Sequence, residues 1–206
     1  MIKYIIFDLD GVLFDGCDLH ATLFINAISK VRPDIYITKE YHDIHLNALS
    51  TRSKLGKMNV IGNDADAVYK LKQEFTGEYI VNNVKEDIKN KELCSKLISL
   101  NYKLYCVTNS IKSTVEEILK RMNIINFFSG IISNQDTTEP KPSPQPYITL
   151  FNKYKLNPSE CLIIEDSPNG IESATRSGAN VYCVRNCDDV TIENILNKIY
   201  SLNHSS

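Results

Sequence analysis

Five short apolar runs, each bounded by polar or turn-forming residues, are the feature that most constrains how this chain can fold. Runs of this length are typical of buried strands, and the segments between the later four have the apolar spacing of helices. The runs cover residues 2–7, 103–107, 130–133, 161–165 and 181–184. This alternation predicts an α/β protein with a mainly parallel sheet and helices on both of its faces.

Residues 16–85 interrupt the alternation directly after the first predicted strand. They show no convincing strand pattern, and their apolar spacing is typical of amphipathic helices. The predicted helices span residues 18–30, 38–48 and 64–82. We therefore predict two domains, a core formed by residues 1–15 and 86–206 and an inserted helical cap domain formed by residues 16–85.

The charge balance argues against two classes of partner. The 206 residues carry a net charge of −2, with 23% charged and 43% hydrophobic residues. This balance gives no electrostatic reason to expect nucleic acid or an anionic membrane as a partner.

No window of the sequence approaches the roughly 20 apolar residues that a membrane span needs. We expect a cytoplasmic protein that is monomeric.

Two carboxylates, Asp8 and Asp10, follow the first predicted strand directly. The carboxyl ends of the strands are where open parallel sheets bind ligands. Because neighbouring carboxylates repel each other, the pair favours a bound hard cation such as Mg²⁺. Asp8 could then attack phosphorus, and Asp10 could protonate the leaving oxygen and later activate water. Gly11 would free the backbone to turn sharply after the pair.

Three polar residues, Thr108, Asn109 and Ser110, follow the predicted strand at 103–107. A hydroxyl together with the backbone N–H groups that open a helix can cradle a phosphate. The same residues are more often only a helix cap, so this motif alone is weak.

Lys141 lies among prolines that fix its backbone, so its ammonium could neutralise both a phosphate and a nucleophile. The helix predicted over 143–155 follows, and Tyr147 is expected on its apolar face.

Glu165 and Asp166 lie at the end of the strand predicted over 161–165, and they could complete a metal site with Asp8. Each group has an ordinary structural explanation when taken alone, so the argument depends on their combination and their order.

The sequences around these groups resemble those of the haloacid dehalogenase-like superfamily. Residues 7–13, Phe-Asp-Leu-Asp-Gly-Val-Leu, are similar to its first motif, and Thr108 and Lys141 to its second and third. Residues 164–171, Ile-Glu-Asp-Ser-Pro-Asn-Gly-Ile, are similar to its fourth. The resemblance covers nearly the whole chain and points to the branch that contains β-phosphoglucomutase and small sugar-phosphate phosphatases.

The resemblance implies a Rossmann-like, doubly wound core whose first strand is central, with the 161–165 strand beside it. It implies Mg²⁺ bound by the side chains of Asp8 and Asp166 and by the backbone carbonyl of Asp10, with Glu165 assisting. His20 matches a histidine often found where the cap of that branch begins.

The chain also departs from the pattern of that branch. It reads Gly-Cys-Asp at residues 16–18, where the branch often has Ser or Thr followed by an acidic residue. Arg52 lies about one position away from the arginine of the mutase's substrate loop. These departures put the mutase substrate in doubt.

We predict a Mg²⁺-dependent phosphatase that hydrolyses a small sugar, polyol or amino-alcohol phosphate through an aspartyl phosphate on Asp8. The candidate substrate-binding residues are Gly11, His20, Arg52, Thr108, Asn109, Ser110 and Lys141. A sugar phosphomutase is the alternative, with Arg52, Lys54 and Lys57 available for a second phosphate. A non-catalytic regulatory protein of the same fold is a further alternative. A dehalogenase would not need Asp10.

Overall fold

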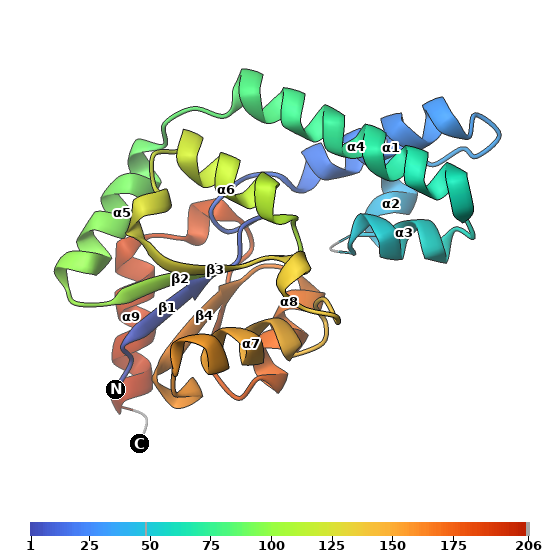
Figure 1. The fold of residues 1–206 in the computed structure, drawn as a ribbon. Helices are drawn as coiled ribbons and strands as arrows, with labels where there is room; N and C mark the ends of the chain where they lie inside the picture. Colours follow the sequence, from blue (N-terminus) through green and yellow to red (C-terminus); the bar gives the residue numbers. More distant parts are fainter. Residues whose placement is uncertain (48, 205–206) are drawn as a thin grey trace. The chain divides into compact units, whose positions relative to one another are not determined.

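The computed structural model describes residues 1–47 and 49–204, and it divides into two compact units (Figure 1). The first unit comprises residues Met1–Asp15 and Lys85–Ser206, and the second comprises Gly16–Val84. Residue 48, the last of the helix predicted over 38–48, lies outside the described residues. Among the residues that are described, no helix combines the length and the apolar character needed to cross a membrane. That the second unit acts as a cap stays a prediction.

A parallel sheet with the strand order β3-β2-β1-β4-β5 forms the centre of the first unit. The strands are β1 (Tyr4–Phe7), β2 (Lys103–Val107), β3 (Phe128–Ile132), β4 (Cys161–Glu165) and β5 (Asn180–Cys183). Ile6 of β1 pairs with Tyr105 on one side and with Ile163 on the other. The structure therefore confirms the expected doubly wound parallel sheet, with the first strand central.

Helices cover both faces of this sheet, with α5 and α9 on one face and α7 and α8 on the other (Figure 1). The α-helices of the first unit are α5 (Ile88–Ser99), α6 (Lys112–Arg121), α7 (Gln145–Tyr154), α8 (Pro168–Arg176) and α9 (Ile192–His204). Short 3-10 turns lie at Ile125–Phe127, Asn134–Asp136, Pro158–Glu160 and Cys187–Asp189. On the α7 face, Leu150 and Phe151 pack against Ile6, Tyr105 and Ile163, and this packing fixes α7 on the sheet.

The carboxyl end of β1 is the topological switch point of the sheet. The chain adds β2 and β3 on one side of β1 and β4 and β5 on the other, and ligands of open α/β sheets typically bind at such a point. Backbone hydrogen bonds continue just past the strands, from Asp8 N to Ile164 O at 3.0 Å and from Thr108 N to Ile132 O at 3.0 Å. The first residues after β1 and β2 are therefore held as firmly as the strands themselves.

The second unit is helical in its described residues, and it has its own apolar core. Its helices are α1 (Cys17–Val31), α2 (Lys39–His45), α3 (Thr51–Lys57) and α4 (Gly62–Asn83). Phe24, Leu55 and Val68 lie in the buried cluster that joins them. Helix α3 was not predicted from the sequence, although Ser50 caps it by accepting a hydrogen bond from Ser53 N at 3.1 Å.

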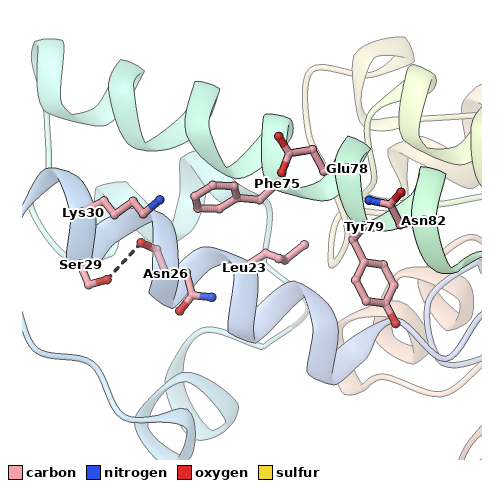
Figure 2. Close-up of a pocket in the computed structure, with 8 residues that line it drawn as sticks. All are labelled: Leu23, Asn26, Ser29, Lys30, Phe75, Glu78, Tyr79 and Asn82. Atoms are coloured by element: carbon pink, nitrogen blue, oxygen red, sulfur yellow. Dashed lines mark hydrogen bonds between the residues drawn. The ribbon is translucent and has the colours of Figure 1, made fainter.

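A groove of about 470 Å³ lies between α1 and α4 (Figure 2). Leu23 and Phe75 lie within it, and the Lys30 ammonium lies 4.8 Å from the centre of the Phe75 ring. The remaining lining residues are Asn26, Ser29, Glu78, Tyr79 and Asn82. The lining carries a positive group, Lys30, and a negative one, Glu78, and it is largely exposed, so we assign no ligand to this groove.

A buried polar pair lies inside the second unit, where Lys54 Nζ is 2.7 Å from His42 Nε2. Both side chains are almost inaccessible to solvent. Burial, together with the neighbouring Lys54 ammonium, lowers the pKa of His42 to about 4. Asp43, at 3.4 Å from the imidazole, opposes this shift only in part.

His42 should contribute a loss of stability as the pH falls from 7 to 5. The unfolded chain protonates His42 near pH 6.5 and the folded chain only near pH 4, so protons favour unfolding between these values. The expected loss in the free energy of unfolding from His42 is about 2 kcal/mol. Urea denaturation of the wild type, His42→Gln and the exposed control His45→Gln at both pH values measures it. The account is wrong here if His42→Gln keeps the full pH dependence of the wild type.

Candidate active site

A buried charge cluster lies at the carboxyl edge of β1. The Lys141 ammonium donates hydrogen bonds to Asp8 Oδ1 at 2.7 Å, to Glu165 Oε1 at 2.5 Å and to the carbonyl oxygen of Val107 at 2.7 Å. These three acceptors use all three protons of the ammonium. Glu165 has no exposed surface, and Asp8 and Lys141 have less than a tenth of theirs. The sequence-predicted Asp8, Lys141 and Glu165 are therefore in direct contact.

The charges in this cluster depend on one another. Burial alone would lower the pKa of Lys141, but Asp8 and Glu165 together raise it well above its usual range, so the amine stays protonated. Burial raises the pKa of the Asp8 carboxyl well above its usual range, and Lys141 opposes that shift. Glu165 and Asp10 raise it further. One lysine thus faces more negative charge than it can balance, which favours a second cation.

The acidic side chains have the arrangement of a metal site. Asp8, Glu165 and Asp166 each offer one oxygen, and these oxygens lie within 4.8 Å of one another. Two buried oxygens, Glu165 Oε2 and Asp166 Oδ1, have no hydrogen-bond partner among the described residues. Burial and the nearby Glu165 raise the pKa of Asp166 to about 6. Carboxylate oxygens are the ligands that hard divalent cations prefer, so the donor set fits such an ion.

Two glycines make room for these carboxylates. Gly11 has φ +87°, and a Cβ built there would overlap Asp166 Oδ2. A Cβ at Gly170, in the first turn of α8, would overlap the Glu165 carboxylate. Any side chain at either position would displace an acidic group of the cluster. Gly11, expected to bind substrate, is here required first for the turn that admits Asp166.

Ser110 and Thr108 connect the end of β2 to Asp10. Ser110 Oγ donates to Asp10 Oδ2 at 2.9 Å, and Thr108 Oγ1 accepts from Ser110 N at 3.0 Å. Both residues were expected to contact a substrate phosphate. Ser110 orients the carboxylate expected to act as the general acid. The phosphate contacts of both residues stay predictions.

Asn109 holds the backbone of Lys141. Lys141 N donates to Asn109 Oδ1 at 3.1 Å, and Asn109 Nδ2 donates to the Lys141 carbonyl oxygen at 3.3 Å. This pair of bonds fixes the loop before α7 against the end of β2. Asn109 was expected to bind substrate, and the structure adds this positioning contact.

Tyr147 is a member of the cluster that the sequence did not reveal. Its hydroxyl donates to Glu165 Oε1 at 2.7 Å, and its ring centre lies 5.1 Å from Lys141 Nζ. The side chain is fully buried in the first turns of α7. From the sequence we expected Tyr147 on an apolar helix face, with no partner for its hydroxyl. Its short separation from Lys141 was the one available signal.

The two remaining candidates, His20 and Arg52, belong to the second unit. Lys72 Nζ lies 3.3 Å from His20 Nδ1. Arg52 pairs with Asp66 at 2.7 Å, and its guanidinium lies 4.4 Å from the ring centre of Tyr69. Their substrate contacts stay predictions.

Comparisons with known proteins agree with this fold. The model of the haloacid dehalogenase-like hydrolase family matches residues 5–184. A phosphoglycolate phosphatase of Aliivibrio fischeri is 27% identical over 192 residues, covering 89% of this chain and 84% of the relative. A putative pyrophosphatase PpaX of Clostridium perfringens is 28% identical over 188 residues, covering 90% and 85%. The solved β-phosphoglucomutase of Clostridium difficile shares the fold, with a TM-score of 0.79, 20% identity and 98% of each chain covered.

A doubly wound parallel sheet with a carboxylate cluster at its switch point defines a Rossmann-like α/β protein with an inserted helical unit. The chain belongs to the haloacid dehalogenase-like hydrolases. This membership confirms the resemblance found in the sequence and the prediction of an enzyme of the phosphatase class.

Proposed function

We propose that this enzyme is a Mg²⁺-dependent phosphatase that hydrolyses a small phosphorylated metabolite through an aspartyl phosphate on Asp8. The observation that carries the proposal is the contact of a buried lysine with Asp8, beside two buried acidic oxygens without partners. A nucleophile, a fixed positive charge and a cation site within one cluster are what phosphoryl transfer requires.

Asp8, Asp166 and Glu165 are the residues that would hold the metal ion, with the Asp10 carbonyl as an expected further ligand. Bound Mg²⁺ would supply Lewis-acid stabilisation of the charge on the phosphoryl oxygens. The all-oxygen donor set supports Mg²⁺ over softer metals.

The first chemical step belongs to Asp8 and Asp10. A carboxylate oxygen of Asp8 forms a bond to phosphorus while the bond from phosphorus to the ester oxygen breaks. Asp10, held by Ser110, gives its proton to the leaving oxygen. The Lys141 ammonium stays beside Asp8 and stabilises the negative charge around the reacting group.

The second step regenerates the enzyme. Asp10, now a carboxylate, removes a proton from water as the water oxygen attacks phosphorus. The bond between phosphorus and Asp8 breaks, which releases inorganic phosphate and restores both carboxyl groups.

Contacts inside the second unit support a phosphatase over the mutase alternative. A mutase needs cations for a second phosphate, and Arg52, Lys54 and Lys57 were the candidates. Arg52 pairs with Asp66, Lys54 is buried against His42, and Lys57 donates to the His45 carbonyl oxygen at 3.0 Å. Each cation is thus already bound to a group of its own unit.

The relatives and the site together support a small phosphorylated compound as the substrate. The relatives are named for phosphoglycolate and for pyrophosphate, both small phosphorylated compounds. We propose a small phosphate ester, with sugar, polyol and amino-alcohol phosphates as the first compounds to test. The enzyme is proposed to act as a monomer in the cytoplasm, without a nucleic-acid or membrane partner.

Metal removal should silence the enzyme. EDTA is expected to lower the release of phosphate from p-nitrophenyl phosphate by at least about 100-fold, because the excess negative charge around Asp8 would repel the substrate. Added Mg²⁺ should restore the rate, and Asp10→Asn should stay slow with Mg²⁺ present. Turnover that survives EDTA would show that the reaction does not depend on the proposed ion.

A screen of phosphorylated metabolites then identifies the substrate.

A further inference from the structure

We infer that Tyr147 is a positioning residue for the metal site, because its hydroxyl holds the Glu165 carboxylate with one oxygen toward Lys141 and the other free for a cation. The inference rests on the proposed function only in taking the acidic cluster to bind a divalent ion.

The two oxygens of Glu165 have different surroundings. Oε1 accepts two hydrogen bonds, one from Tyr147 at 2.7 Å and one from Lys141. Oε2 is buried and has no partner among the described residues, and Gly170 leaves the space beside it. Two donors on one oxygen fix the rotation of the carboxylate, and they leave Oε2 as the oxygen available to an ion.

Tyr147 is the steadier of the two donors. The Lys141 ammonium is shared among Glu165, Asp8 and the Val107 carbonyl, so its contact with Glu165 depends on the charge of Asp8. The Tyr147 ring lies in the same apolar cluster as Leu150 and Ile163, so packing fixes the hydroxyl. Tyr147 can therefore hold Glu165 in place when the ion and the substrate change the charge around Lys141.

Removal of the hydroxyl should weaken metal binding. Tyr147→Phe keeps the ring and its packing, so the fold should be retained. Among the described residues, Lys141 is then the one remaining donor to Glu165, so the carboxylate can turn away from the ion. We expect the dissociation constant for Mn²⁺ to rise about 10-fold, the range typical for groups that orient metal ligands. At saturating metal, kcat should stay within about 3-fold of the wild type, because no group that touches substrate is changed.

The experiment is a Mn²⁺ titration of the full chain, read by electron paramagnetic resonance of the free ion, for the wild type, Tyr147→Phe and Tyr105→Phe. Tyr105 is a matched control because it is buried in the same apolar cluster, while its hydroxyl is hydrogen-bonded to Ser129. Circular dichroism confirms the fold of each variant. In a Glu165→Gln background, Tyr147→Phe should add no more than about a 2-fold change, because the effect acts through Glu165.

Three results would overturn the inference: equal affinities of the wild type and Tyr147→Phe, equal weakening by Tyr105→Phe, or a wild type that binds no Mn²⁺. A 10-fold loss confined to Tyr147→Phe supports it. A wild type that binds Mn²⁺ but releases no phosphate from any ester would refute the proposed function alone, since the metal titration does not require turnover.

Discussion

Asp8→Asn is expected to lower kcat by about 10,000-fold or more, because an amide oxygen cannot form the phosphoenzyme that a carboxylate forms. The fold should be retained. Burial already raises the pKa of Asp8, so the substitution removes a negative charge that is costly to bury, and Lys141 keeps its contact with Glu165. Phosphate release at saturating Mg²⁺ measures the effect, with a melting curve for the fold.

Asp188→Asn is the matched control for this prediction. The Asp188 side chain is 93% exposed in the turn after β5, so its loss should leave kcat within about 2-fold of the wild type. A rate for Asp8→Asn close to that of Asp188→Asn would remove Asp8 as the nucleophile.

Lys141→Met should damage both stability and activity. The variant leaves Asp8 and Glu165 buried without their counter-charge, and removing one partner of a buried pair costs about 3–5 kcal/mol. Loss of the fixed positive charge beside the nucleophile should also lower kcat by about 1,000-fold. Urea denaturation in EDTA measures the free energy of unfolding, so that no bound cation replaces the lysine.

The cost of Lys141→Met should depend on pH in a defined direction. Without the lysine, which opposes the upward shift, the folded pKa of Asp8 rises further above its unfolded value of about 4. The folded variant then binds more protons than the unfolded chain, so its stability falls as the pH rises. The gap to the wild type should therefore be larger at pH 8 than at pH 5. The exposed control Lys96→Met should show a pH-independent change below about 0.5 kcal/mol.

The sheet could be predicted because its strands are short apolar runs with sharp polar ends. The runs at 103–107 and 161–165 match β2 and β4 residue for residue. Parallel strands end at one edge of a sheet, so polar groups near the strand ends were expected to lie close together. In the structure Lys141 contacts both Asp8 and Glu165.

Contacts between side chains could not be predicted in the same way. The apolar spacing predicts that Tyr147 lies on the inner face of α7. Its hydroxyl bonds Glu165, the last residue of β4, and the spacing within one helix gives no information about that contact. The hydrogen bond from Ser110 to Asp10 was not predicted either, because it joins the ends of two strands that are far apart in the sequence. Helix α3 was not predicted because its seven residues have too few apolar positions to show a helical period.

The most direct test of the account is the position of a divalent ion in crystals soaked with Mn²⁺. The account predicts an anomalous scattering peak bonded to a carboxylate oxygen of Asp8 and one of Asp166, beside Glu165. A saturated crystal with no peak between these carboxyl groups, in a protein that still hydrolyses phosphate esters, would contradict it.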